Sequence, residues 1–134
     1  MNHNILVDDF NKEILILVKF MKKKDKKNID IEWLYKILCT IKNENPSFII
    51  EKCIDKLWHN RDHILNRSEL FFKDDYEKKW IKEDCRKEWL SSFICHIKNN
   101  MFILNDEEKT FTWDHVNNML KIVIEYRLIK KYHN

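Results

Sequence analysis

The side chains best suited to metal chemistry lie near the middle of this 134-residue chain. Asn60, Asp62 and Glu69 follow the pattern N-x-D-x-x-L-x-x-x-E, which spaces oxygen donors much as a calcium-binding loop does. Calcium requires about six or more oxygen ligands and a sharp turn that glycine normally supplies. Trp58 and His63 stand where a ligand and that glycine would be. We therefore expect no bound metal and no cofactor, and only these three side chains remain as candidate ligands in this segment.

Histidine and cysteine pairs suggest two further chemistries, and both are incomplete. His59 and His63 are four residues apart, which suits a metal on one helical face, but the neighbouring residues supply no obvious third ligand. Cys95 and His96 are adjacent, so on a helix their side chains diverge by about 100° and form a poor nucleophile–base pair. Without glycine there is also no glycine-rich phosphate loop. We expect no enzymatic activity.

The composition indicates the fold class that carries these side chains. Hydrophobic residues make up 44% of the chain, enough for a folded core. Glycine is absent, and sheet-rich folds need it for hairpin turns and bulges, so helices are favoured. No segment resembles an interdomain linker. The sequence predicts one compact all-α domain over residues 1–134, with about five to six helices and a possible division into lobes at 1–72 and 73–134.

Charge and cysteine content limit the partners and the compartment. The net charge of +3 is too balanced to indicate nucleic acid, and no apolar stretch is long enough to span a membrane. The basic run at 22–27 could contact phosphate or an acidic membrane, although a solvated loop between helices is the simpler interpretation. Cysteines without C-x-x-C spacing are expected to be reduced core thiols of a cytoplasmic protein. They are Cys39, Cys53, Cys85 and Cys95.

Apolar residues recur at helical intervals along most of the chain. The predicted helices run from about Asp9 to Met21, from an N-cap at Asp30 to about Asn43, from Pro46 through Leu57, from about Asp74 through Ile97, and from about Trp113 to Lys130. Asn45 is expected to cap the third of these helices, because proline suits a first helical position. Ile54 and Leu120 lie in the middle of apolar stripes and are predicted to be buried.

Three segments restart the apolar pattern with one cadence, in which an apolar residue is followed five positions later by another. They are Ile29–Leu34, Leu65–Leu70 and Phe111–Val116. In this cadence the chain resembles the EF-hand superfamily, of the calmodulin, troponin C and myosin light chain type, over about residues 10–72 and 93–124. The resemblance implies helix–loop–helix units whose loops meet in pairs. Ile29 and Leu65 are therefore expected to lie side by side in a short antiparallel bridge.

The resemblance implies binding of another protein without calcium sensing. Lys22, Trp58 and His115 occupy positions where the family has oxygen ligands. A degenerate member of the family would be a non-catalytic, light-chain-like adaptor that grips an amphipathic helix of a partner in an apolar groove. The candidate groove residues are Phe71, Phe72, Met101, Phe102, Trp113 and Met119.

Two other folds stay open from the sequence. One is an unrelated helical bundle, acting as an all-α interaction or regulatory protein such as one encoded by a parasite or a virus. The other is a nucleic-acid-binding winged helix, the least expected of the three. In that fold, residues 101–104 and 109–113 would be strands joined by a turn at Asn105 and Asp106.

Overall fold

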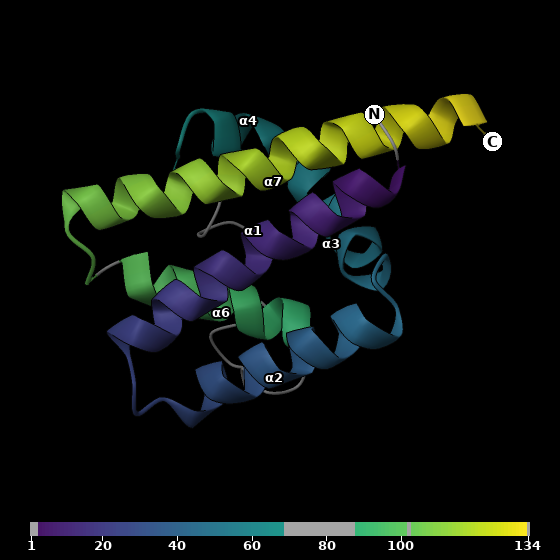
Figure 1. Cartoon of the computed structure of the whole chain (residues 1–134). Helices are drawn as coiled ribbons and strands as arrows, with labels where there is room; N and C mark the ends of the chain where they lie inside the picture. The colour runs from purple at the N-terminus through teal and green to yellow at the C-terminus, as the bar shows by residue number, and fades with distance from the viewer. Residues whose placement is uncertain (1–2, 69–87, 102, 134) are drawn as a thin grey trace.

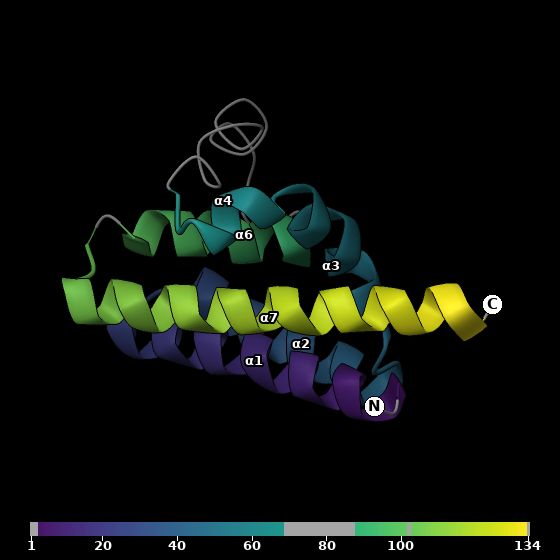
Figure 2. The same ribbon diagram turned by 90° about the horizontal axis from the view of Figure 1, so that it is seen from above.

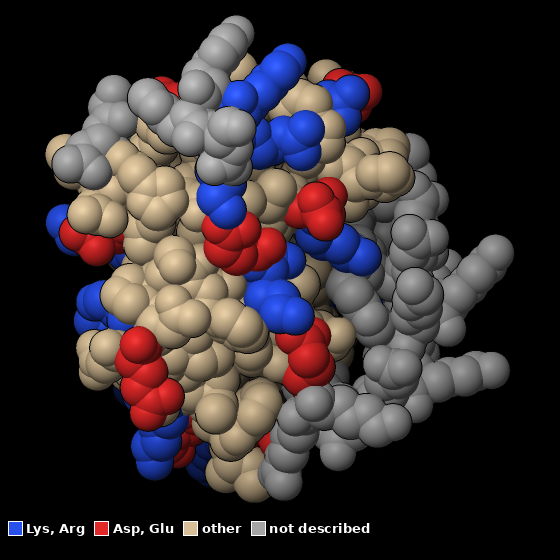
Figure 3. All heavy atoms as spheres, turned by 90° about the vertical axis from the view of Figure 1, so that its right-hand side faces the viewer, with Lys and Arg blue, Asp and Glu red and all other residues tan. Residues whose placement is uncertain are grey.

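All regular structure in the computed structural model is helical within the residues that it describes, which are 3–68, 88–101 and 103–133. The helices are α1 (His3–Lys24), α2 (Ile29–Glu44), α3 (Phe48–His59), α4 (Arg61–Leu65), α6 (Trp89–Met101) and α7 (Asp106–His133). The prediction of a compact all-α domain is confirmed. The two long helices, α1 and α7, run antiparallel and side by side, and both chain termini lie at the same end (Figures 1 and 2). At that end, acidic and basic side chains are interspersed (Figure 3).

Contacts along the α1–α7 pair show its antiparallel register. As residue numbers rise along α1, the residue numbers of the contacting partners in α7 fall. These partners are His3 with Tyr126, Glu13 with His115, Phe20 with Phe111, and Lys24 with Glu108. α2 packs on α1 along the edge away from α7, and α6 packs against both α1 and α2. The buried core extends through every long helix, because each presents one apolar face inward.

Of the two residues predicted to be buried, one is fully buried and the other is partly buried. Leu120 is fully buried, so its prediction is confirmed. Ile54 is half-buried and packs against the core from its margin. The predicted helix start near Asp74 lies outside the described residues, whereas α6 buries Trp89 and Phe93 as its apolar stripe indicates.

α1 is longer than the sequence predicts at both ends. It begins at His3, and Lys22, Lys23 and Lys24 form its last turn where a loop was expected. Lysines suit this position because the helix dipole places partial negative charge at a C-terminus. The amide of Asp25 then closes the helix by donating to the carbonyl of Met21 at 3.0 Å.

The caps of α2 and α3 differ from the predicted ones. Asn28, not Asp30, caps α2: its side-chain oxygen accepts from the amides of Asp30 at 3.0 Å and Ile31 at 3.2 Å. Asp30 lies in the first turn, where a carboxylate is attracted to the positive end of the helix dipole. α3 begins after Ser47, two residues later than predicted, because Asn45 is used to end α2.

The hairpin that a winged helix would have over residues 101–113 is not formed by the described residues. Met101 ends α6, and α7 begins at Asp106, seven residues before the predicted start at Trp113. Asn105 and Glu108 form a reciprocal capping box: the Asn105 side chain accepts from the Glu108 amide at 2.9 Å, and the Glu108 carboxylate accepts from the Asn105 amide at 3.1 Å. This start signal outweighs the strand-favouring residues that follow.

The predicted bridge between Ile29 and Leu65 is also wrong. Ile29 is the first residue of α2 and is 65% exposed, and Leu65 is the last residue of α4 and is 56% exposed. α2 and α4 lie on opposite edges of the molecule, with α1 and α7 between them (Figure 1). Two segments expected as loops, the one before Leu65 and the one before Phe111, are helical instead.

Candidate functional site

The predicted groove residues do not form a surface groove within the described part of the chain. Met101, Trp113 and Met119 are all buried and belong to the core cluster. Phe71, Phe72 and Phe102 lie outside the described residues. A partner could reach the three buried side chains only by opening the core.

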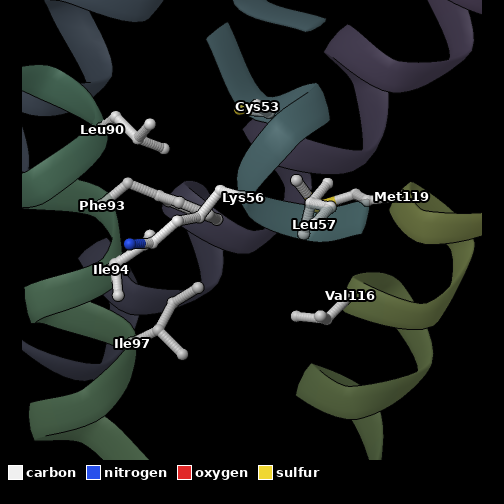
Figure 4. A pocket seen from close by; sticks show the side chains of 9 residues that line it. All are labelled: Cys53, Lys56, Leu57, Leu90, Phe93, Ile94, Ile97, Val116 and Met119. Carbon is white, nitrogen blue, oxygen red and sulfur yellow. The ribbon is translucent and has the colours of Figure 1, made fainter. Parts of the chain in front are cut away.

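Met119 lines a small apolar cavity between α3, α6 and α7 (Figure 4). The other lining residues are Cys53, Lys56, Leu57, Leu90, Phe93, Ile94, Ile97 and Val116. Its volume of about 20 Å³ is room for one water molecule at most. Burial raises the pKa of the Cys53 thiol, with a further contribution from Glu88, so this cysteine is not activated as a nucleophile. The cavity is a packing defect of the core.

The candidate metal ligands do not come together in the described residues. Asn60 lies between α3 and α4, and its side-chain amide donates to the Lys56 carbonyl at 2.9 Å. Asp62 is exposed on α4, and Glu69 lies outside the described residues. His59 ends α3 and His63 lies in α4, so the two imidazoles belong to different helices. No group of three metal-binding side chains is found in the ranges that the structure describes.

The cysteines differ from the sequence prediction at one position. Cys39 and Cys53 carry free thiols, as expected. Cys95 is disulfide-bonded, so the prediction of reduced thiols is wrong there. Cys85 lies outside the described residues.

A depression lined mainly by lysines lies where the end of α1 meets the first turns of α2. It has a volume of about 330 Å³ and is lined by Lys19, Lys22, Lys23, Lys26 and Tyr35. We call these five residues the lysine corner. In Figure 1 it lies where α1 ends and α2 begins, at the end of the molecule away from both termini.

Two ammonium groups of the lysine corner lie near one aromatic ring. Nζ of Lys22 lies 4.7 Å from the centroid of the Tyr35 ring, and Nζ of Lys19 lies 5.9 Å from it. Both distances are within the range of a cation–π interaction, which holds an ammonium near the negative face of the ring. Tyr35 therefore positions two positive charges that would otherwise move freely in solvent.

No carboxylate of the described residues forms an ion pair with a lysine of the corner. Among the described residues, none of its four lysines forms an ion pair, whereas the neighbouring Lys24 pairs with Glu108 and Lys36 with Glu32. Asp25, the closest acid in sequence, accepts a hydrogen bond from the Asn28 side chain at 3.1 Å. The dipole of α1 offers about half a negative charge at this end, far less than four ammonium groups carry. The surplus positive charge makes the corner a candidate anion-binding site.

Sequence reasoning identified the basic run of this site but not the site itself. The spacing of Lys19, Lys22 and Lys23 places them on one face of a helix. A prediction that α1 continues to Lys24 would have shown this shared face. Tyr35 could not be assigned, because its ring reaches the lysines only through the packing of α2 on α1.

Comparisons with protein-family models, curated proteins and solved structures find no match to this chain. Among the described residues, none of the helices combines the length and the apolar character needed to cross a membrane.

Proposed function

We propose that this chain is a non-catalytic protein-binding module whose lysine corner receives an acidic segment of a partner protein. The observation that supports this is the set of four lysines without carboxylate partners around one depression. Each ammonium has three donors and full charge, so a run of acidic side chains would satisfy both the hydrogen bonds and the electrostatics of the site.

The shape and charge of the corner favour a peptide segment over a membrane or a nucleic acid. A depression of about 330 Å³ accommodates a few side chains, whereas a bilayer presents a broad surface. Nucleic acids need a basic stripe that follows several phosphates. The net charge of the chain is only +3, which is too balanced to indicate nucleic acid.

The proposal keeps the expected class of partner but changes the binding surface. A calmodulin-like grip on an amphipathic helix would need exposed apolar groove residues, and Met101, Trp113 and Met119 are buried. The lysine corner is available at the surface without rearrangement of the core. Electrostatic attraction, rather than burial of apolar surface, is therefore expected to provide most of the binding free energy.

The experiment uses a fluorescein-labelled peptide of about ten residues rich in glutamate, titrated with the whole chain and followed by anisotropy. The double variant Lys22→Gln/Lys26→Gln is expected to bind about tenfold more weakly, since each lost contact of this kind contributes up to about 1 kcal/mol. The matched control is Lys12→Gln/Lys121→Gln, which removes two exposed lysines outside the corner and should change affinity by less than about twofold.

Circular dichroism of both double variants checks that each is folded. The proposal fails if the peptide does not bind, or if the control weakens binding as much as the corner variant. Preferential binding of anionic vesicles or of single-stranded RNA by the same lysines would assign the corner to a different class of partner.

A further inference from the structure

We infer that the lysine corner selects a phosphorylated partner segment over one that carries only carboxylates. This inference rests on the proposed function, because it specifies the chemistry of the ligand at the same site. Three features of the corner lead to it: the type of cation, the arrangement of the ammonium groups and the amount of unbalanced charge.

The cations of the corner are all lysines. A lysine ammonium acts as a compact point charge with three rotatable donors, whereas arginine presents a planar fork that matches the planar carboxylate. A phosphoryl group is tetrahedral and offers three acceptor oxygens with about −1.5 to −2 charges at neutral pH. Several ammonium groups can approach such a group from different directions. The lysine set therefore suits a tetrahedral dianion better than a single carboxylate.

Two of the ammonium groups lie near the same aromatic ring. Those of Lys19 and Lys22 both lie within 6 Å of the Tyr35 ring centroid, at 5.9 and 4.7 Å. Lys23 and Lys26 line the same depression. Within the described residues, the Tyr35 hydroxyl has no hydrogen-bond partner and is free to donate to a further oxygen of the ligand.

The amount of charge points the same way. Charges act together when they lie within the Debye length, about 8 Å at physiological ionic strength. Four ammonium groups lining one depression are balanced by about two phosphoryl groups, or by one together with adjacent acids. Carboxylates would need about twice as many side chains to balance the same charge.

The test compares three peptides of identical sequence that carry serine, glutamate or phosphoserine at two adjacent positions. Anisotropy titration near pH 7.5 is expected to show the phosphoserine peptide binding at least about fivefold more tightly than the glutamate peptide. The preference should decrease near pH 5.5, because the second pKa of a phosphoryl group is about 6 and its charge falls there.

Two variants connect the preference to the corner. Lys22→Gln is expected to reduce the ratio of phosphoserine to glutamate affinity, and Lys22→Arg, which keeps the charge, to retain most of the affinity for both peptides. Tyr35→Phe removes the free hydroxyl and should weaken binding of the phosphoserine peptide by about twofold to fivefold. Lys12→Gln serves as the neutral control on the same helix.

The outcomes separate this inference from the proposed function. Equal affinity for the glutamate and phosphoserine peptides overturns phosphate selection and leaves an acidic-segment module in place. Failure of both peptides to bind overturns both statements. A vesicle arm, with a phosphoinositide at a few per cent in neutral lipid, distinguishes the source of the phosphate: tighter binding to these vesicles than to the phosphoserine peptide overturns the assignment to a protein segment.

Discussion

Tyr126 joins three helices through one hydroxyl group. The side chain is fully buried on α7, donates to Oε1 of Glu51 on α3 at 2.5 Å, and lies 3.0 Å from Nε2 of His3 on α1. Burial and the bond to Glu51 raise the pKa of Tyr126, so it stays a donor. Burial acts to raise the pKa of Glu51, but hydrogen bonds from Lys130 and Tyr126 outweigh it and lower the pKa. These directions indicate a structural contact, because an acid–base tyrosine would need a pKa moved toward neutrality.

Replacing Tyr126 with phenylalanine is expected to lower the free energy of unfolding by about 1–2 kcal/mol, since a hydrogen bond to a carboxylate is lost while the ring is kept. Urea denaturation measures the change. Tyr35→Phe is the matched control and should differ from the parent by less than about 0.5 kcal/mol, because its hydroxyl is at the surface corner. Equal stabilities for Tyr126→Phe and the parent would mean that the contact contributes nothing.

His96 on α6 is expected to make stability depend on pH. Burial lowers its pKa below 6.5, partly opposed by Asp25 and Asp30, and within the described residues its Nε2 has no hydrogen-bond partner. The unfolded chain therefore binds a proton more readily than the folded one as pH falls through 6.5. We expect this contribution to be complete above about pH 6.5 and to decline as pH is lowered toward the folded-state pKa.

The measurement is urea denaturation of the parent and of His96→Leu at about pH 7.5 and pH 5. The parent should lose more stability between these two values than the variant does, because only the parent carries the buried imidazole. A variant that loses as much stability as the parent would assign the pH dependence to other groups.

At the scale of elements, caps decide where the helices begin. Asn28 caps α2 through two amide bonds, and Asn105 with Glu108 caps α7. Ser47 precedes α3 without a side-chain cap bond. The short α4 depends instead on side chains from α7: Asn117 donates to the Ile64 carbonyl at 3.1 Å, and Asp114 pairs with Arg67 at 2.5 Å. Local polar contacts thus set the boundaries that apolar periodicity leaves open.

Asn28→Ala is expected to cost about 1 kcal/mol of stability, because two amides at the start of α2 lose their acceptor. Ser47→Ala should cost only a few tenths, since no cap bond is removed. Chemical denaturation of the two variants side by side provides the comparison. Equal losses would show that the cap geometry does not determine the effect.

At the scale of the whole molecule, the lysine corner and the contacts of Tyr126 lie at opposite ends of the long α1–α7 pair. The cluster around Tyr126 lies at the end of α1 that begins with His3, and the lysine corner lies at the other end. The apolar core between them extends through the long helices. Binding at the lysine corner therefore needs no change in the core or in the contacts of the termini.

The stability lost on truncating a core side chain should increase with the burial of that side chain. Leu120→Ala is expected to lower the free energy of unfolding by about 2–5 kcal/mol, because a fully buried leucine leaves a cavity. Ile54→Ala should cost clearly less, since its side chain is half-buried at the margin. Thermal and urea unfolding both measure which of the two variants loses more stability. A larger loss at Ile54 would contradict the placement of α3 against the core.

The sequence by itself determined the helical class and the inward faces, because helical periodicity and the absence of glycine are local properties. It therefore predicted Leu120 correctly. Tertiary structure alone decided that Met101, Trp113 and Met119 are core, and that Ile29 and Leu65 lie apart. Residue spacing does not predict which helices contact each other, since helices with the same apolar pattern can pack in many arrangements. The lysine corner has the same origin: its lysines are visible in the sequence, but only the packing of α2 on α1 brings Tyr35 beside Lys19 and Lys22.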